Sequence, residues 1–205
     1  MIVIVDYGMG NLFSIKSALD YLGAESIISS DPDTIKKANK LILPGVGSFK
    51  MAVANLKKDN LDSNIKESVG KRKTPILGIC LGMQLLCLSS TEDGLSNGFG
   101  FINAPIERFK NTLASNFKVP HVGFATVSVM RKNRLFVGLN TEVDFYFTHS
   151  FRLFFENQPF AVGKCFHGEN FVAAFEKENI CGTQFHPEKS QTNGLIVLKN
   201  FIEKF

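Results

Sequence analysis

The sequence predicts an α/β fold with a central, mostly parallel sheet, an antiparallel extension and flanking helices. In the first half of the chain, short runs rich in Ile, Val and Leu alternate with segments of helical periodicity. This alternation is typical of a parallel sheet whose strands are joined by helices. From about residue 99 to residue 185, strand-like segments follow one another through turns, which indicates antiparallel strands added to the sheet.

The expected elements follow in chain order. In the first half they are a strand at 2–5, a helix at 11–22, a strand at 26–28, a helix at 33–38, strands at 41–43 and 75–78, and a helix at 81–88. The antiparallel strands are expected at 122–130, 144–148, 161–166, 171–175 and 180–185. A last amphipathic helix, 194–205, has Leu195, Leu198 and Phe201 near one face and is expected to pack back onto the sheet.

Length and composition favour one domain spanning 1–205. The chain has 205 residues, 44% of them hydrophobic, and no Pro-, Gly- or Ser-rich linker. The net charge of +4 is spread along the chain, and its densest cluster, Lys71-Arg72-Lys73, fits a solvated loop, so no nucleic-acid partner is expected.

Neither a signal peptide nor a membrane span is expected. The start lacks a basic region before its short apolar run, and no later run approaches the roughly twenty apolar residues of a span, so we expect a soluble, cytoplasmic protein with no membrane partner. The cysteines show no C-x-x-C spacing, which favours reduced thiols over disulfides or a metal site; they are Cys80, Cys87, Cys165 and Cys181.

Cys80 is the candidate nucleophile. It stands in Gly78-Ile79-Cys80-Leu81-Gly82, between an expected strand and an expected helix. Flanking glycines permit a sharp turn that holds a nucleophile in a strained backbone conformation, and the positive end of a helix favours a negatively charged sulfur. The alternative is a buried structural cysteine.

His186 is the candidate acid and base, because a cysteine nucleophile needs a proton shuttle. It lies in Gln184-Phe185-His186-Pro187-Glu188, at the end of the last expected strand. Glu188 would fix the imidazole tautomer as the third member of a triad. The alternative is a turn with a solvated carboxylate. Taken alone, the other three histidines (His121, His149 and His167) are weaker candidates.

An oxyanion hole is expected beside the cysteine. The N–H of Leu81, the residue after the nucleophile, is one donor. A second donor is expected at Val46 or Gly47 in the loop Pro44-Gly45-Val46-Gly47, because open α/β folds bind ligands at the carboxyl edge of the sheet. The alternative is an ordinary strand-to-helix turn.

Together these motifs resemble the class I (triad) glutamine amidotransferases, and above all the glutaminase subunit of imidazole glycerol phosphate synthase. The resemblance covers nearly the whole chain and rests on Asp6-Tyr7-Gly8-Met9-Gly10-Asn11, Leu43-Pro44-Gly45-Val46-Gly47, the Cys80 motif continued by Met83-Gln84-Leu85-Leu86, Pro120-His121-Val122-Gly123, Tyr146-Phe147-Thr148-His149-Ser150 and Gln184-Phe185-His186-Pro187-Glu188-Lys189-Ser190. It implies a flavodoxin-like fold and hydrolysis of glutamine to glutamate and ammonia, with no cofactor.

The resemblance also implies residue roles. Cys80 would form a glutamyl thioester, with His186 as acid and base and Glu188 as its orienting partner. The residues implied to hold glutamine are Gln84 and Glu92, with the backbone around Gly47, His149 and Ser150. The carboxylate of Glu92 suits the α-ammonium group of the substrate.

The implied partner is a (β/α)₈ cyclase that forms a heterodimer with this subunit and receives its ammonia to make imidazole glycerol phosphate and AICAR in histidine biosynthesis. Docking is expected near Asn11, His121 and Lys189, with Lys189 paired to a partner carboxylate. Because Val46 resists positive φ, the loop is expected to rest with a carbonyl at the oxyanion position until a peptide flip, driven by the partner's substrate, switches it on.

Several alternatives remain open. The chain reads His121-Val122-Gly123-Phe124-Ala125 where the family usually has His-Met-Gly-Trp-Asn, so a paralogue that feeds ammonia into the amidation of a bacterial surface sugar is a second reading. The glutaminase of pyridoxal phosphate synthesis and a stand-alone cysteine peptidase match its motifs poorly. From another class, the chain would be a catalytically inactive regulatory or binding subunit.

Overall fold

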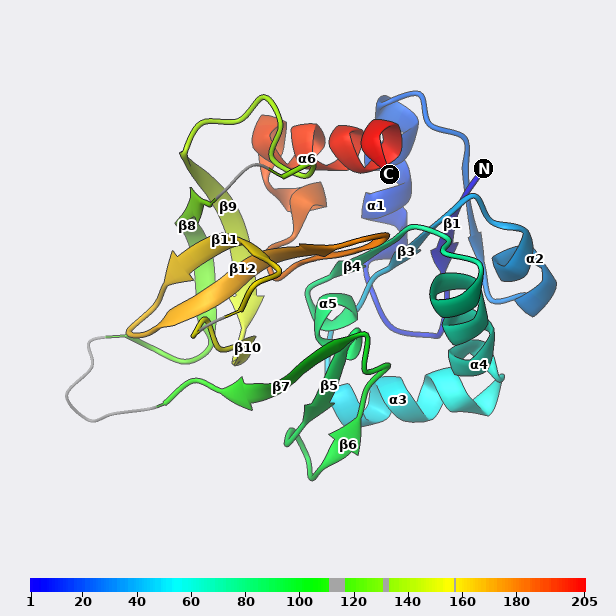
Figure 1. The fold of residues 1–205 in the computed structure, drawn as a ribbon, viewed down its shortest axis with the longest axis horizontal. Coiled ribbons are helices and arrows are strands. Elements are labelled where there is room, and N and C mark those ends of the chain that lie inside the picture. The colour runs from blue at the N-terminus through cyan, green and yellow to red at the C-terminus, as the bar shows by residue number, and fades with distance from the viewer. Residues whose placement is uncertain (111–116, 131–132, 157) are drawn as a thin grey trace.

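A sheet of nine strands forms the centre of the computed structural model, which describes residues 1–110, 117–130, 133–156 and 158–205 (Figure 1). The strand order is β2-β1-β3-β4-β13-β12-β11-β8-β9. Neighbours from β2 to β13 are parallel, and those from β13 to β9 are antiparallel. The predicted fold class is therefore confirmed.

The strands lie close to their predicted positions. The parallel strands are β1 (Ile2–Val5), β2 (Ser26–Ser29), β3 (Lys40–Leu43), β4 (Ile76–Ile79) and β13 (Ile180–Thr183). β13 was expected among the antiparallel strands, but it joins the two parts of the sheet, because it pairs parallel with β4 and antiparallel with β12. The antiparallel strands are β8 (His121–Val129), β9 (Glu142–His149), β11 (Ala161–Phe166) and β12 (Asn170–Lys177).

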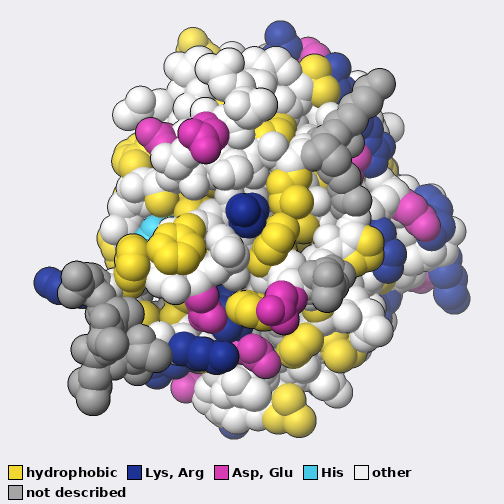
Figure 2. Space-filling model, turned by 60° about the vertical axis from the view of Figure 1, so that its left-hand side comes forward, with side chains coloured by type: hydrophobic (Ala, Val, Ile, Leu, Met, Phe, Trp, Pro, Cys, Tyr) yellow, Lys and Arg dark blue, Asp and Glu magenta, His cyan; other side chains and the backbone are white. Residues whose placement is uncertain are grey.

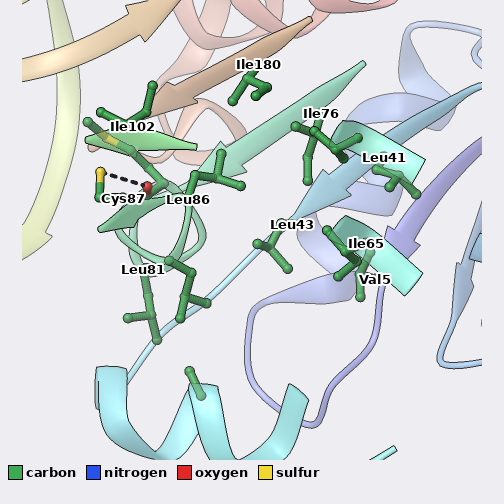
Figure 3. Close-up of a cluster of buried hydrophobic side chains, with 14 of the residues drawn as sticks. Val5, Leu41, Leu43, Ile65, Ile76, Leu81, Leu86, Cys87, Ile102 and Ile180 are labelled. Atoms are coloured by element: carbon green, nitrogen blue, oxygen red, sulfur yellow. Dashed lines mark hydrogen bonds between the residues drawn. The ribbon is translucent and has the colours of Figure 1, made fainter. Parts of the chain in front are cut away.

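Helices cover both faces of the parallel part of the sheet. They are α1 (Leu12–Tyr21), α2 (Pro32–Lys37), α3 (Phe49–Lys58), α4 (Leu61–Lys66) with the π-helical turn η1 (Glu67–Lys71), α5 (Leu81–Leu85), the 3₁₀ turn η2 (Pro187–Lys189) and α6 (Gln191–Lys204). Side chains alternate between faces along a strand. Accordingly, Ile2 and Ile4 pack with α1 and α6, whereas Val3 and Val5 pack with α2, α3 and α4 (Figure 3).

The prediction of a helix at 81–88 is wrong at its C-terminal end. α5 stops at Leu85, and β5 (Cys87–Ser90) begins a small second sheet with β6 (Ser96–Asn97), β7 (Ile102–Arg108) and β10 (Phe151–Leu153). The carbonyls of residues 85–88 accept hydrogen bonds from the backbone N–H groups of residues 98, 99, 100 and 102. This tertiary pairing overrides helical periodicity, which does not distinguish a short buried strand from a continued helix.

Two further differences concern helices. No helix was expected at 49–66, where α3 and α4 lie, although Ser48 caps α3 by accepting from the N–H of Met51 at 3.5 Å. The last helix begins at Gln191 and not at 194, so Gly194 lies inside it. A Cβ there would lie 1.9 Å from the Pro187 carbonyl oxygen, so the glycine lets α6 approach η2.

We predict that Gly82→Ala lowers the free energy of unfolding by about 2–4 kcal/mol. A Cβ at Gly82 would lie 1.8 Å from the carbonyl oxygen of Leu43, so the backbone of β3 or α5 has to move. Gly70→Ala is the matched control, because a Cβ there meets only Phe101 Cε1 at 3.8 Å. Urea denaturation checks both; equal effects would contradict the predicted contact.

Candidate active site

Cys80 occupies a strained turn between β4 and α5. Its φ is +53° and its ψ −109°, a conformation that is rare for residues other than glycine. The N–H of Cys80 donates to the Thr183 carbonyl at 2.7 Å. A Cβ at Gly78 would lie 2.6 Å from the backbone nitrogen of Met83. The flanking glycines thus permit the close backbone approach that the turn requires.

The pairing of β4 with β13 brings His186 toward Cys80. Ile79 lies opposite Thr183 in this parallel pair, so the residues that follow both strands emerge together at the carboxyl edge. The backbone of His186 is held by Tyr146, whose carbonyl accepts its N–H at 2.9 Å, and by the Ser190 hydroxyl, which donates to its carbonyl at 2.6 Å. The position of the ring is therefore fixed from two sides.

Glu188 sets the tautomer of His186. Its Oε1 lies 2.8 Å from His186 Nδ1, and both side chains are at most 2% exposed. Because an ionised carboxylate only accepts, Nδ1 carries the proton and Nε2 faces away from Glu188. Nε2 is buried and makes no hydrogen bond of ordinary length in the described part of the chain.

Opposing effects act on the pKa of His186. Burial by itself lowers this pKa, but the interactions with Cys80 and Glu188 outweigh it and raise the pKa of His186 to about 10. A protonated imidazole beside a sulfur favours the thiolate, and a thiolate favours the imidazolium. The geometry is thus that of a cysteine–histidine pair oriented by a carboxylate.

A cavity of about 180 Å³ opens beside the sulfur. Its lining combines the loop after β3, the turn between β4 and α5 that carries Cys80 (the elbow), a residue after β5 and the end of β9: Val46, Gly47, Cys80, Leu81, Gln84, Glu92, Thr148, His149, Ser150 and Phe151. The structure therefore brings together, around one cavity, the nucleophile and all residues predicted for the oxyanion hole and for substrate binding.

The loop after β3 packs tightly against the elbow. The Tyr7 hydroxyl donates to the Pro44 carbonyl at 2.7 Å, and a Cβ at Gly45 would lie 2.5 Å from the same hydroxyl. Burial, with the nearby Cys80, raises the pKa of Tyr7. The positive φ of the loop, +101°, falls on Gly47 and not on Val46, whose side chain is exposed. No role of its own was predicted for Tyr7.

Glu92 presents a carboxylate at the rim of the cavity. Its Oε2 accepts from the N–H of Phe49 at 2.8 Å, which anchors the side chain at the start of α3. Burial raises the pKa of Glu92, the Phe49 N–H opposes that rise, and neighbouring Asp93 adds to it. The carboxylate is thus fixed in place and only half-buried, as a binding group for a cation requires.

His149 and His121 form a buried neutral pair behind the cavity wall. His149 Nδ1 lies 2.8 Å from the Phe151 carbonyl, so it donates, and Nε2 accepts from His121 Nδ1 at 3.3 Å. Burial is the main cause that lowers the pKa of His149 to about 3 and that of His121 to about 4. The His121 ring stacks on Phe147 and His167, with centroid distances of 4.9 and 4.1 Å.

The predicted docking residues differ in exposure. Lys189 is exposed, with Nζ 5.8 Å from the centroid of the Tyr146 ring, and Asn11 is partly exposed at the start of α1. His121 is only 5% exposed and its ring points inward, while its neighbours Val122 and Phe124 are 58% and 53% exposed. On β8, these two apolar side chains present the outward surface.

Of the four histidines, only His167 is not buried. Figure 2 shows a small histidine surface at the left of one face of the molecule, beside hydrophobic side chains. All four cysteines are free thiols. Within the described ranges we find neither a helix long and apolar enough to cross a membrane nor a His, Cys, Asp and Glu cluster suited to a metal ion.

Comparison with known proteins adds a family. The model of the family described as glutamine amidotransferase class-I matches residues 3–205. A protein of Campylobacter jejuni subsp. jejuni serotype O:23/36 (strain 81-176), named imidazole glycerol phosphate synthase subunit HisH 1, is 44% identical over 201 residues and 98% of each chain.

Methanococcus maripaludis has two such relatives. Its imidazole glycerol phosphate synthase subunit HisH 2 is 45% identical over 204 residues, covering 100% of both chains. Its subunit HisH 1 is 40% identical over 205 residues, covering 99% of both chains. One organism thus carries two proteins of this name.

Solved structures agree with the fold. A structure described as glutamine amidotransferase superposes with a TM-score of 0.74 at 18% identity, covering 99% of this chain and 98% of its own. PurLQS from Thermotoga maritima gives a TM-score of 0.74 at 18% identity, covering 98% and 96%. At these identities the likeness shows the fold alone.

We predict that acid weakens the fold through the two buried imidazoles. Below pH 6.5 the unfolded chain protonates both rings, whereas the folded chain does not until about pH 4 for His121 and about pH 3 for His149, so stability falls as the pH falls through this window. Each ring should contribute a loss of roughly 2 kcal/mol between pH 7 and pH 5. His186, whose pKa is raised, acts in the opposite direction and above this window.

Urea unfolding at pH 7 and pH 5 measures this loss in the wild type and in His121→Gln, which keeps a donor for His149 but removes one titrating ring. The variant should lose less stability on acidification. Phe117→Leu, a change beside His167 that removes no titrating group, is the control. An unchanged pH dependence in His121→Gln would refute the assignment.

Proposed function

The chain belongs to the class-I glutamine amidotransferase family, among the subunits named HisH, and from this membership we propose that it is the glutaminase subunit of an imidazole glycerol phosphate synthase. As a member of this family it is a glutamine-hydrolysing enzyme. The observation that carries the proposal is the buried His186–Glu188 pair beside Cys80 on a strained turn. We expect the enzyme to act in the cytoplasm, where thiols stay reduced.

The proposed chemistry is acyl transfer through Cys80. The thiolate attacks the side-chain carboxamide carbon of glutamine, and the negative charge that develops on oxygen is stabilised by the Leu81 N–H and a second N–H from the Val46–Gly47 loop. Protonated His186 gives its Nε2 proton to the departing nitrogen, so the C–N bond breaks and ammonia leaves. His186 then takes a proton from water, which attacks the thioester and releases glutamate and the thiolate.

The lining of the cavity supports the proposed binding roles. Glu92 would pair with the α-ammonium group of glutamine. Gln84 uses its Nε2 in hydrogen bonds to Phe151 and Gln184. Its Oε1, which has no hydrogen-bond partner among the described residues, would accept from the substrate. The backbone of His149 and Ser150 would bind the remaining polar groups, because the His149 ring has both nitrogens occupied.

For the partner, we propose a (β/α)₈ cyclase that forms a heterodimer with this chain and uses its ammonia to make imidazole glycerol phosphate and AICAR. The docking surface would comprise Val122 and Phe124 on β8, Tyr146 on β9, and Lys189. Phe124 and Tyr146 lie edge to face at 5.6 Å, and Lys189 lies over the Tyr146 ring. Lys189 would pair with a partner carboxylate at the edge of this apolar surface, near Asn11.

The Val46–Gly47 loop would make hydrolysis depend on the partner. In the resting state a carbonyl, and not an N–H, would face the oxyanion position, because Val46 disfavours the positive φ of the flipped peptide. Docking of the partner with its own substrate would favour the flip. Allosteric coupling of this kind typically needs about 1–3 kcal/mol.

A second candidate function uses the same chemistry with another acceptor. Methanococcus maripaludis carries two HisH proteins, both at least 40% identical to this chain, so paralogues occur in this family. Val122 and Phe124 stand where the histidine-pathway subunits usually carry Met and Trp. A paralogue would supply ammonia for the amidation of a bacterial surface sugar. A catalytically inactive regulatory subunit, whose cysteine would not react with a glutamine analogue, is the third candidate.

We predict that Glu188→Gln lowers the kcat of glutamine hydrolysis by about 10²–10⁴-fold, because an amide can present an N–H to Nδ1 and favour the wrong tautomer. Cys80→Ala should abolish turnover and also covalent labelling by a glutamine-analogue electrophile, followed by mass spectrometry. Glu178→Gln, an exposed change far from the cavity, is the matched control. An unlabelled wild-type Cys80 would indicate the inactive subunit.

We further predict that the isolated chain hydrolyses glutamine at least about 10-fold more slowly than the complex with partner and nucleotide substrate. Val46→Gly should raise the activity of the isolated chain, because glycine accepts positive φ, whereas Val46→Ala should not. Full glutaminase activity of the isolated wild-type chain would contradict the proposed loop mechanism.

The same assay identifies the acceptor. Imidazole glycerol phosphate and glutamate formed at equal rates with the histidine-pathway cyclase of the same source would support the first function. Glutamate release only with a second cyclase-like protein would support the paralogue.

A further inference from the structure

Gln184 is a buried amide next to the sulfur of Cys80. The residue follows β13 directly and is 0% exposed, although its side chain has a polar acceptor and a polar donor. Burying such a group without hydrogen-bond partners is destabilising. Both polar atoms of the Gln184 side chain have a partner: Oε1 lies 3.0 Å from Gln84 Nε2, and Nε2 lies 3.6 Å from Cys80 Sγ. The backbone is fixed by the Gln184 N–H, which donates to the Ala173 carbonyl at 2.8 Å.

The direction of these hydrogen bonds follows from a backbone carbonyl. Phe151 O can only accept, so the Gln84 atom 3.0 Å from it must be the nitrogen Nε2. The second N–H of this nitrogen points to Gln184, which must therefore present its oxygen there. Consequently the nitrogen of Gln184 faces the sulfur, and its N–H is the group that reaches Cys80.

We propose that Gln184 is a positioning residue for the nucleophile: its Nε2–H hydrogen-bonds the sulfur of Cys80 and holds it as a thiolate directed at the glutamine cavity. This inference rests on the proposed function, because it requires Cys80 to be the reacting group. It adds to the cysteine, histidine and glutamate a residue that touches the sulfur without exchanging protons.

The surroundings of the sulfur explain why a neutral donor matters. As a thiol, Cys80 donates to the Thr148 carbonyl at 3.8 Å, and as a thiolate it loses that bond and accepts from Gln184. A hydrogen bond to the charged form favours that form. An N–H that keeps its proton at every pH stabilises the thiolate even after His186 has given its own proton away.

Titratable groups approach the sulfur from three other elements. His186, backed by Glu188, comes from the segment after β13, and the Tyr7 hydroxyl comes from the loop after β1. His149 on β9 is neutral and directs neither ring nitrogen at Cys80. His186 is therefore the one cation among them, and Gln184 is the neutral donor.

The test compares the reactivity of Cys80 across pH in the full-length chain. Wild type, Gln184→Met and Gln184→Glu are treated with iodoacetamide from pH 5 to pH 10, and mass spectrometry quantifies alkylation of Cys80. Cys80→Ala gives the background of the other three cysteines, all of which are buried. In Gln184→Met the pH midpoint should move upward by about one unit, and in Gln184→Glu by more, because a carboxylate repels the thiolate.

A control separates positioning from general destabilisation. Asn200 is another buried amide, 5% exposed, whose Nδ2 donates to the carbonyls of Leu135 and Val137 far from the site. Asn200→Leu should lower the unfolding free energy and leave the alkylation midpoint where it is. In glutaminase assays with the partner, Gln184→Met should lower kcat about 10-fold with little change in KM.

The outcomes are distinct. Upward shifts in the Gln184 variants, with none in Asn200→Leu, support the proposal. A wild-type midpoint in folded Gln184→Met or Gln184→Glu overturns it while leaving the proposed function intact. No specific alkylation of Cys80 in the wild type at any pH would instead overturn the proposed function. Circular dichroism establishes which variants are folded. The test needs only one folded Gln184 variant, either Gln184→Met or Gln184→Glu.

Discussion

The parallel pairing of β4 with β13 is the constraint on which the site depends. These strands are about a hundred residues apart in sequence, and their register sets Ile79 against Thr183. The Cys80 N–H closes the end of this pair by bonding to the Thr183 carbonyl. A one-residue slip would move each side chain to the other face of the sheet. The register therefore decides whether the imidazole and the amide after β13 meet the sulfur after β4.

Around this pair the protein buries polar groups almost without net charge. Two amides and two neutral imidazoles form the wall behind the cavity, and each direction of hydrogen bonding is fixed by the carbonyl of Phe151. In a medium of low dielectric constant, satisfied neutral groups cost less than charges do. The buried His186–Glu188 pair belongs to the reacting groups, and the low dielectric constant strengthens its interaction.

How much of this could be predicted depended on how local each signal was. The elbow glycines and the His-Pro-Glu turn are contiguous motifs, so Cys80, His186 and Glu188 were found directly. The end of α5 was not predicted correctly, because the carbonyls of residues 85–88 accept hydrogen bonds from the segment 98–102, outside the helix. The role of Gln184 was not predicted, because it depends on Gln84 and Phe151, which only the fold brings together. The inward turn of the His121 ring has the same cause: its partners, His149 and His167, lie on other strands or turns.

The contrast between the fixed wall and the loop after β3 indicates where activity can change. Behind the sulfur, the amides of Gln84 and Gln184 and the rings of His121 and His149 hydrogen-bond one another or the Phe151 carbonyl. Movement there would leave buried polar groups unpaired, at a cost of roughly 1–3 kcal/mol each. The Tyr7 hydroxyl holds the loop at the Pro44 carbonyl. At Val46 and Gly47 the described residues form no comparable hydrogen bond: the Val46 side chain is exposed and Gly47 has a positive φ. The proposed switch, which needs only a few kcal/mol, would therefore act on this part of the loop, and the triad would stay assembled in both states.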